Sequence, residues 1–250
     1  MNNKKVIQKI EELSINALPA LETELVDGWI LRFSNGYAKR ANSINPLYPS
    51  KYEIKEKIED MQKIYRSKNL KAVYKLTENV FPHDLDVILE QEGYELDGLT
   101  SVQLLSLNEV SVSPAANAVN YSYLNDKWFL DFCKLNNIKE TDQATLKKIL
   151  QNIVPEVCYV TLLNDNNDAL ACGMSVLEDE YIGLFDIVTN EKHRSKGYGK
   201  QLIYTILNWG KENGAKNAYL QVVLDNRPAL NLYSKLGFKE EYRYWYRIKS

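Results

Sequence analysis

The chain has little of what marks several large classes of protein. Of its 250 residues only three are cysteines and two are histidines. Cys133, Cys158 and Cys172 are odd in number, far apart and without a Cys-x-x-Cys pair, so the sequence indicates neither a disulfide framework nor a zinc site. We therefore expect a cytoplasmic protein that needs no metal.

A strong charge of one sign and long apolar runs are missing too. Lys and Arg total 31 against 33 Asp and Glu, a formal net charge of -2, which is far from the basic excess that nucleic-acid binding requires. No stretch approaches the roughly 18 apolar residues of a membrane span. Residues 1–13 lack the apolar core of a secretory signal, and their apolar residues are spaced as on one face of a helix. The sequence predicts a soluble protein whose partners are neither nucleic acid nor membrane.

The apolar pattern predicts strands alternating with helices on both sides of a weak segment. Residues 110–120 break any apolar period, so we place a boundary there and predict domains 1–112 and 113–250. In the first domain we expect a helix within 1–13, strands 21–33 and 37–44 joined by Ser34-Asn35-Gly36, a helix 52–68, a strand 72–76 and a helix 83–92. In the second we expect helices 125–135 and 141–153, strands 157–163, 170–177 and 181–189, a helix 197–213, a strand 218–223, a helix 227–236 and a strand 239–247. This order predicts an α+β protein with a mixed central sheet flanked by helices.

One short pattern occurs twice. Residues 89–94 read Leu-Glu-Gln-Glu-Gly-Tyr and residues 233–238 read Tyr-Ser-Lys-Leu-Gly-Phe, each closing a predicted helix and leading into a strand. A glycine after a helix is common at helix ends, so the echo allows either an internal duplication or chance.

A glycine-rich loop joins a predicted strand to a predicted helix at residues 187–200. Backbone N–H groups at a helix N-terminus favour anions, and glycine lets the backbone approach a phosphate closely. Arg194, Lys196 and Lys200 add positive charge. Leu202 stands where a dinucleotide-binding fingerprint needs its third glycine, and Arg194 stands where a P-loop needs its first. The loop therefore predicts an anion site of another kind, or simply a helix start with capping glycines.

A second cluster of motif residues, at 226–238, helps to interpret this loop. Arg194-x-x-Gly197-x-Gly199 after one strand, followed after the next by Asn226-x-x-Ala-x-x-Leu-Tyr233-x-x-x-Gly-Phe238, resembles the GNAT superfamily of acetyl-CoA-dependent N-acetyltransferases. The first domain carries Gly28-Trp29-Ile30-Leu31-Arg32 and Arg40-Ala41-Asn42-Ser43, which resembles two-domain GNAT proteins whose first half is a degenerate copy. The resemblance implies tandem GNAT-like domains, of which the second is catalytic.

The resemblance also implies a site for the acyl donor. Strands 181–189 and 218–223 would separate, and acetyl-CoA would lie in the gap between them. The acetyl-CoA-binding residues would be Ile187, Val188, Thr189, Arg194, Ser195, Lys196, Gly197, Tyr198, Gly199, Lys200 and Asn226. An asparagine before a helix also serves as a plain N-cap, so Asn226 keeps both interpretations.

Tyr233 is implied as the general acid, protonating the coenzyme A thiolate as it leaves; the alternative is a core aromatic. Many relatives carry a Glu base on one of the separating strands, but those positions are Gly183 and Gln221 here. Asp186 is the nearest alternative base, although strand alternation could turn it away. The acidic turn 178–180 and a chain of water molecules are further options.

The implied acceptor site contains Trp29, Arg32, Arg40, Asn42 and Gln221, with an interdomain salt bridge and packing as the other interpretation of the first-domain residues. We expect an N-acetyltransferase that moves acetyl from acetyl-CoA to a primary amine, with a small molecule as acceptor. The alternatives are a non-catalytic acyl-CoA sensor, a transferase with another acyl donor, and an enzyme that acts on a protein or peptide amine. Strand edges and the first helix could support a homodimer.

Overall fold

The computed structural model describes residues 3–249 and divides the chain into two compact units. The first contains the residues up to Ser101 together with those from Tyr242 onward, and the second runs from Val102 to Glu241. The sequence placed the boundary at residue 112, in a connection that the structure assigns wholly to the second unit. The two strands that cross the division, β5 and β11, each contribute residues to both units.

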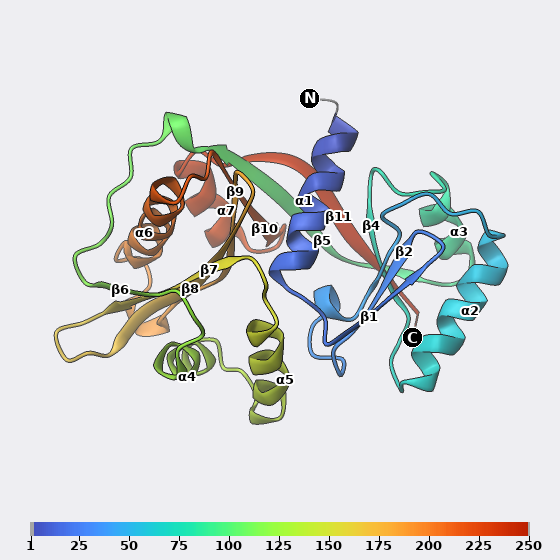
Figure 1. Ribbon diagram of the computed structural model, residues 1–250, viewed down its shortest axis with the longest axis horizontal. Coiled ribbons are helices and arrows are strands. Elements are labelled where there is room, and N and C mark those ends of the chain that lie inside the picture. The colour runs from blue at the N-terminus through green and yellow to red at the C-terminus, as the bar shows by residue number, and fades with distance from the viewer. Residues whose placement is uncertain (1–2, 250) are drawn as a thin grey trace. The chain divides into compact units, whose positions relative to one another are not determined.

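The first unit builds a sheet and three helices (Figure 1). Its elements are α1 (Asn3–Ala17), β1 (Glu22–Val26), β2 (Trp29–Phe33), β3 (Ile44–Asn45), α2 (Ile54–Ser67), β4 (Val73–Thr77), α3 (Leu85–Gln91) and the start of β5 (Glu95–Ser106). The apolar residues Ile58, Met61 and Tyr65 of α2 are buried, and they pack on the inner sides of β2 and β4 to form the core of the unit. The helical spacing of these residues predicts this face correctly.

The hairpin of the first unit differs from the prediction. The turn lies at Asp27-Gly28, where both residues have positive φ, 43° and 82°, and β1 pairs antiparallel with β2 across it. Positive φ at both turn residues is the conformation that Asp-Gly favours in two-residue hairpins. A Cβ at Gly28 would lie 2.4 Å from the carbonyl oxygen of Pro49, so glycine is also required for space.

The predicted strand 37–44 is wrong over most of its length. Residues Lys39–Ala41 form a short 3-10 turn, and only Ile44–Asn45 pair as a strand. The cause is the side chain of Asn42, whose Oδ1 accepts the backbone N–H groups of Ser34 at 2.7 Å and Gly36 at 2.9 Å. These bonds satisfy the backbone N–H groups of Ser34 and Gly36 without a strand partner, and residues 37–43 form a loop.

The second unit follows the predicted order closely. It contains the end of β5, β6 (Ala118–Tyr121), α4 (Asp126–Leu135), α5 (Glu140–Gln151), β7 (Glu156–Leu163), β8 (Ala169–Glu178), β9 (Tyr181–Thr189), α6 (Tyr198–Glu212), β10 (Asn217–Val223), α7 (Arg227–Lys235) and the start of β11 (Lys239–Ile248). Strands β6 to β9 pair antiparallel in sequence, and β10 joins β9 in parallel. The prediction missed β6, which falls in and beside the segment interpreted as a linker.

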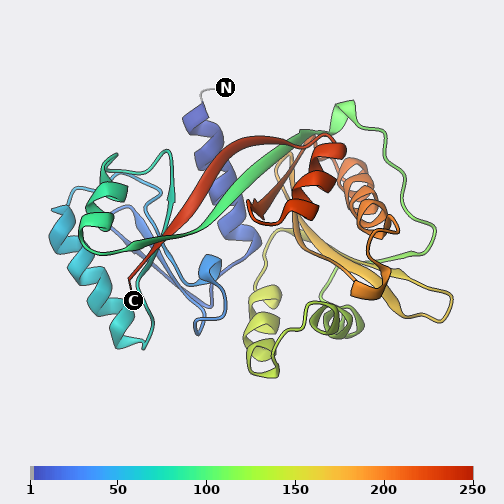
Figure 2. The ribbon, with the colours of Figure 1, turned by 180° about the vertical axis from the view of Figure 1, so that it is seen from behind.

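Helices cover both faces of this sheet. Figures 1 and 2 show α6 on one side of β7, β8 and β9, and α4 with α5 on the other. On the α6 side a Cβ at Gly210 would lie 2.6 Å from Ile182 Cδ1, so this glycine lets α6 approach β9. On the α4 side the indole of Trp128 donates to the carbonyl oxygens of Val160 and Gly173 at 3.1 and 3.2 Å. The sheet is therefore fixed from both faces.

The two units share one order of elements. The first reads β1-β2-β3-α2-β4-α3-β5, and the second reads β7-β8-β9-α6-β10-α7-β11. In each, a helix connects a parallel pair of strands, β3 with β4 and β9 with β10. The repetition extends the short sequence echo to whole elements and favours duplication over chance.

Candidate active site

The gap expected between two strands is present in the second unit. Pairing of β9 with β10 runs from Tyr181–Asn217 to Leu184–Leu220, although β9 continues to Thr189 and β10 to Val223. Beyond Leu184 the backbone groups of β9 that would face β10 are therefore released from the ladder. An extended ligand with amide groups can pair with such a strand edge.

An irregularity in β9 lies at the start of this gap. Cys172 pairs with Val188 and Met174 with Phe185, so Asp186 and Ile187 together oppose Gly173 in a β-bulge. Asp186 has a positive φ of 54°. The bulge interrupts the alternation that made the direction of Asp186 uncertain, and its half-buried carboxylate lies close enough to Tyr159 for its charge, after burial, to raise the pKa of that phenol.

The loop after β9 forms a turn that leads directly into α6. A short 3-10 turn at Glu191–His193 is capped by the Asn190 side chain, which accepts the N–H of Lys192 at 3.1 Å. Ser195 and Gly197 then take positive φ values of 62° and 87°. The first helical hydrogen bond of α6 runs from the N–H of Gln201 to the carbonyl of Gly197, so the N–H groups of residues 198–200 have no partner within the helix.

Space and charge at this helix start both suit an anion. A Cβ built on Gly197 would meet nothing within 4 Å, so the approach to the free N–H groups is open. At Gly199 a Cβ would lie 3.3 Å from Leu232 and 3.4 Å from the Thr189 hydroxyl, so this glycine allows α6 to start against β9 and α7. Arg194, Lys196 and Lys200 surround the turn, and the N–H groups with the helix dipole can hold a pyrophosphate there.

Helix α7 presents the implied general acid. Asn226 caps this helix, its Oδ1 accepting the N–H of Ala229 at 3.2 Å. Tyr233 is buried in the core of the unit, with its ring edge-on to Phe238 at 5.9 Å. Burial raises the pKa of Tyr233 to about 12, and its hydroxyl makes no hydrogen bond to any residue in 3–249. It is thus a protonated phenol at neutral pH, with its proton available.

The two positions where relatives carry a base have different surroundings. Gly183 is covered by the ring of Tyr219, because a Cβ there would lie 2.6 Å from the tyrosine hydroxyl. Gln221 is half-buried, one residue past the last pair of the β9–β10 ladder. Because strand residues alternate, Gln221 shares the face of the sheet occupied by Tyr219. Of the residues considered as base, only Asp186 is a carboxylic acid on the part of β9 beyond its last pair with β10.

Three of the four first-unit residues assigned to the acceptor site are structural. Trp29 has no exposed surface and packs edge-on to Tyr74 in the core. The buried guanidinium of Arg32 donates to the backbone carbonyls of Leu18 and Arg40, and buried Asn42 holds the loop described above. The burial of Trp29, Arg32 and Asn42, with the backbone partners of the last two, favours the packing interpretation of these residues over contact with a substrate.

Arg40 differs from these three because it is half-buried. It lies on the 3-10 turn and not on a strand, as does the capping position held by Asn42, so the predicted strand locations of both residues are wrong. The short motifs Gly28-Trp29-x-x-Arg32 and Arg40-Ala41-Asn42-Ser43 therefore contain residues that stabilise the fold of the first unit. Gly28 forms the turn, Trp29 packs in the core, and the side chains of Arg32 and Asn42 make hydrogen bonds to backbone groups.

Sequence reasoning missed the bulge, the covering of Gly183 by Tyr219 and the contact of Thr189 with the glycine turn. No local signal marks a bulge, because it depends on the register of two strands. The glycine at 183 was a usable signal, since glycine inside a strand often marks a close approach of another group.

Within residues 3–249 no group of three or more His, Cys, Asp or Glu side chains is placed to hold a metal ion. In the same range, no helix combines the length and apolar character needed to cross a bilayer.

Comparison with known proteins agrees with this geometry. Residues 5–247 match the model of a family described as "Probable histone acetyltransferase Rv0428c C-terminal". The chain is 29% identical over 250 residues to the uncharacterised N-acetyltransferase YobR of Bacillus subtilis, covering 97% of this chain and 98% of that one. The fold resembles a GCN5-related N-acetyltransferase from Kribbella flavida, with a TM-score of 0.70, 14% identity and coverage of 97% and 95%. It also resembles a tandem GNAT protein from the clavulanic acid biosynthesis pathway, with a TM-score of 0.68, 11% identity and coverage of 96% and 87%.

Proposed function

Because the chain belongs to the Rv0428c C-terminal acetyltransferase family and is an acyltransferase of the GNAT type, we propose that it transfers acetyl from acetyl-CoA to the primary amine of a small molecule. The observation that carries the choice of donor is the junction of β9 with α6. There an unpaired strand edge, capable of binding amide groups, leads directly into a helix start with free N–H groups and open space at Gly197. A pantetheine arm with its pyrophosphate has the same sequence of amides followed by an anion.

The donor would lie along β9 with its pyrophosphate at residues 194–200. Ile187 and Thr189 would offer backbone groups to the pantetheine amides, and the side chain of Asn226 would contact the same arm while still capping α7. Basic residues of the loop would neutralise the phosphates. The thioester would then lie where β9 and β10 separate.

Transfer would proceed by direct attack of the amine. The nitrogen lone pair forms the new C–N bond to the thioester carbonyl carbon, the C–S bond breaks, and the electron pair leaves on the sulfur of coenzyme A. The Tyr233 hydroxyl protonates this thiolate. A phenol whose pKa is raised to about 12 stays protonated at neutral pH and can regain its proton from solvent after each turnover.

The acceptor ammonium must lose one proton before attack, and its nitrogen loses a second once the C–N bond has formed. Asp186 lies on β9 just beyond its last pair with β10, so we assign it the first proton, taken from the amine directly or through a water molecule. The second proton leaves to solvent. Gln221, on the neighbouring strand, would donate or accept hydrogen bonds to the acceptor. Since no covalent enzyme intermediate is formed, catalysis comes from positioning and proton transfer.

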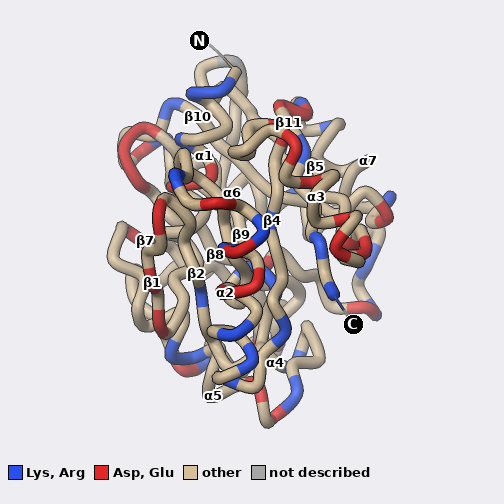
Figure 3. Tube along the Cα trace, turned by 90° about the vertical axis from the view of Figure 1, so that its right-hand side faces the viewer, with Lys and Arg blue, Asp and Glu red and all other residues tan. Residues whose placement is uncertain are grey.

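A small acceptor is favoured over a basic protein tail by charge. Lys and Arg alternate with Asp and Glu along the chain, as the blue and red segments of Figure 3 show, and the formal net charge is only -2. Recognition of a basic tail calls for a concentrated field of the opposite sign.

The test is acceptor-dependent release of thiol from acetyl-CoA, measured against matched panels of small amines, amino acids and peptides. Release with a small primary amine and not with peptides supports the proposal. Release with peptides alone would show that the acceptor is a protein or peptide amine. Binding of acetyl-CoA without release from any acceptor would favour an acyl-CoA sensor.

A further inference from the structure

Among the described residues, the first unit has no strand that corresponds to β6, and an open pocket lies between its first strand and the helix α2. In the second unit β6 pairs with the outer edge of β7. The segment leading to β6 lies along α6, since the N–H of Ala115 donates to the Thr205 hydroxyl at 2.9 Å and the Lys211 ammonium donates to the Val110 carbonyl at 2.8 Å. By element order, β1 and α2 of the first unit correspond to β7 and α6.

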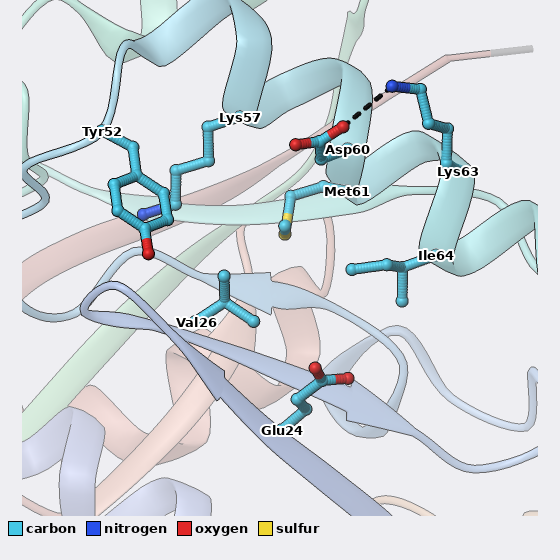
Figure 4. A pocket seen from close by; sticks show the side chains of 8 residues that line it. All are labelled: Glu24, Val26, Tyr52, Lys57, Asp60, Met61, Lys63 and Ile64. Atoms are coloured by element: carbon cyan, nitrogen blue, oxygen red, sulfur yellow. Dashed lines mark hydrogen bonds and ion pairs between the residues drawn. The ribbon is translucent and has the colours of Figure 1, made fainter.

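No strand within residues 3–249 pairs with the outer edge of β1, which stands at the end of its sheet. A pocket lies between β1 and α2 (Figure 4). Its volume is about 370 Å³. We call it the β1–α2 pocket, and it is lined by Glu24, Val26, Tyr52, Lys57, Asp60, Met61, Lys63 and Ile64. Val26, Met61 and Ile64 give it an apolar centre.

The backbone of β1 can accept a further strand. Val26 and Trp29 flank the two-residue turn and pair with each other, and such a closing pair is hydrogen-bonded in an antiparallel hairpin. By alternation, Thr23 and Leu25 direct their N–H and C=O groups away from β2. The Leu25 side chain is also 67% exposed, on the face opposite the pocket.

The charged residues that line the pocket indicate which side chains a bound strand should carry. The Lys57 ammonium is held by Asp27 at 3.1 Å, and Lys63 is paired with Asp60 at 2.8 Å. The Glu24 carboxylate makes no ion pair or hydrogen bond with any described residue. An incoming strand with a basic residue opposite Glu24 would therefore gain a pair, while a second copy of β1 paired about Glu24 would place Glu24 against Glu24, and one paired about Leu25 would leave Glu24 without a charged partner.

We propose that β1 binds an extended segment of a partner protein as an added antiparallel strand. One aliphatic side chain of that segment fills the β1–α2 pocket, and a basic side chain two residues away pairs with Glu24. Main-chain hydrogen bonds to Thr23 and Leu25 supply affinity, and the alternating apolar and basic residues supply specificity. The β1–α2 pocket belongs to the first unit, and this proposal does not depend on the proposed acceptor.

The probe is a fluorescein-labelled peptide containing Leu-Val-Lys-Thr-Ser, which places Leu opposite Val26 and Lys opposite Glu24. Glu22, the next β1 residue on that face, is already paired with Lys68, so the probe places no charge there. Its control has the lysine replaced by glutamate. Fluorescence anisotropy with the full chain is expected to show saturable binding of the basic peptide and at least about tenfold weaker binding of the acidic one, because an opposite-charge pair at Glu24 becomes a like-charge contact. Glu24→Lys is expected to reverse this preference.

A second pair of variants tests the backbone bonds. Leu25→Pro removes an outward N–H on an edge strand, where proline is tolerated, and Leu25→Ala keeps that N–H while removing the same side chain. We expect Leu25→Pro to weaken binding about tenfold relative to Leu25→Ala, with thermal unfolding and acetyl transfer equal in the two variants.

The proposal would be overturned if the basic peptide showed no saturable binding, or if the basic and acidic peptides bound equally well. It would also be overturned if light scattering showed a dimer that Leu25→Pro dissociates, because the outer edge of β1 would then bind a second copy of the chain. If Leu25→Pro does not fold, Glu24→Lys still tests the proposal through the change in peptide preference.

Discussion

The ring of Tyr219 lies against the backbone of Gly183, so that a Cβ at position 183 would fall 2.6 Å from both the hydroxyl oxygen and Cζ of the tyrosine. Phe185 closes the same space from the other side, with its Cε2 also 2.6 Å away, and its ring stands edge-on to Tyr219 at 5.9 Å. The position that carries a base in many relatives is therefore filled by packed aromatic rings.

Restoring a carboxylate at 183 is expected to fail. Gly183→Ala should lower the free energy of unfolding by about 1–3 kcal/mol through overpacking, and Gly183→Glu should lower it further without raising turnover. Urea unfolding of both variants, with thiol release measured on the folded fraction, tests this. Wild-type stability in Gly183→Ala would show that the rings move aside easily.

The hydroxyl of Tyr233 can be removed with little structural change. It makes no hydrogen bond to a described residue, and a phenylalanine keeps the edge-on contact with Phe238. Tyr233→Phe is expected to lower kcat about 10²-fold, the effect of losing a general acid, while the Kd for acetyl-CoA changes by less than about twofold. Stopped-flow turnover and calorimetry separate these effects. Unchanged kcat would show that another group protonates the thiolate.

The raised pKa of Tyr233 gives a further measurable sign. A pKa of about 12 in the folded state against about 10 in the unfolded chain stabilises the fold fully below pH 10. That contribution is lost as pH rises toward 12, at up to about 1.4 kcal/mol per pH unit. Comparing urea unfolding of the wild type and Tyr233→Phe from pH 9 to pH 11 isolates it, because the variant shares every other titrating tyrosine. Parallel pH profiles would contradict the burial of the phenol.

The second unit was predictable because its signals are local. Helix caps such as Asn226 and turn glycines such as Gly197 mark element ends within a few residues, and the helices and strands from Asp126 to Ile248 begin and end close to the predicted positions. The start of α6, where we propose the anion site, was also predictable, since helix starts and basic residues are local features.

The errors have different causes. Residues 37–44 were predicted as the strand that follows Ser34-Asn35-Gly36, but the Asn42 side chain accepts hydrogen bonds from the N–H groups of Ser34 and Gly36. Asp27-Gly28 was a stronger hairpin signal than Ser34-Asn35-Gly36, and it was overlooked because the apolar run 29–33 made 21–33 resemble one strand. The bulge at Asp186 follows from the pairing of β8 with β9, which no single segment encodes.

The structural interpretation of Asn42 separates stability from substrate binding. Asn42→Ala leaves two buried N–H groups without their acceptor, so we expect a loss of about 1–3 kcal/mol in the free energy of unfolding and an unchanged KM for the acceptor amine. Differential scanning calorimetry and steady-state kinetics well below the transition measure the two quantities. A raised KM with unchanged stability would return Asn42 to the acceptor site.

The most direct test of the central claim is calorimetric titration of the wild type, Gly197→Asp and Gly197→Asn with acetyl-CoA. Asp and Asn have nearly the same size and tolerate the left-handed backbone similarly, and a Cβ at 197 meets nothing within 4 Å, so the two variants differ in charge alone. We predict one-to-one binding to the wild type, and binding to Gly197→Asp at least about tenfold weaker than to Gly197→Asn, because a carboxylate then faces the pyrophosphate. Absence of binding to the wild type, or equal affinity of the two variants, would contradict an acetyl-CoA site at the start of α6.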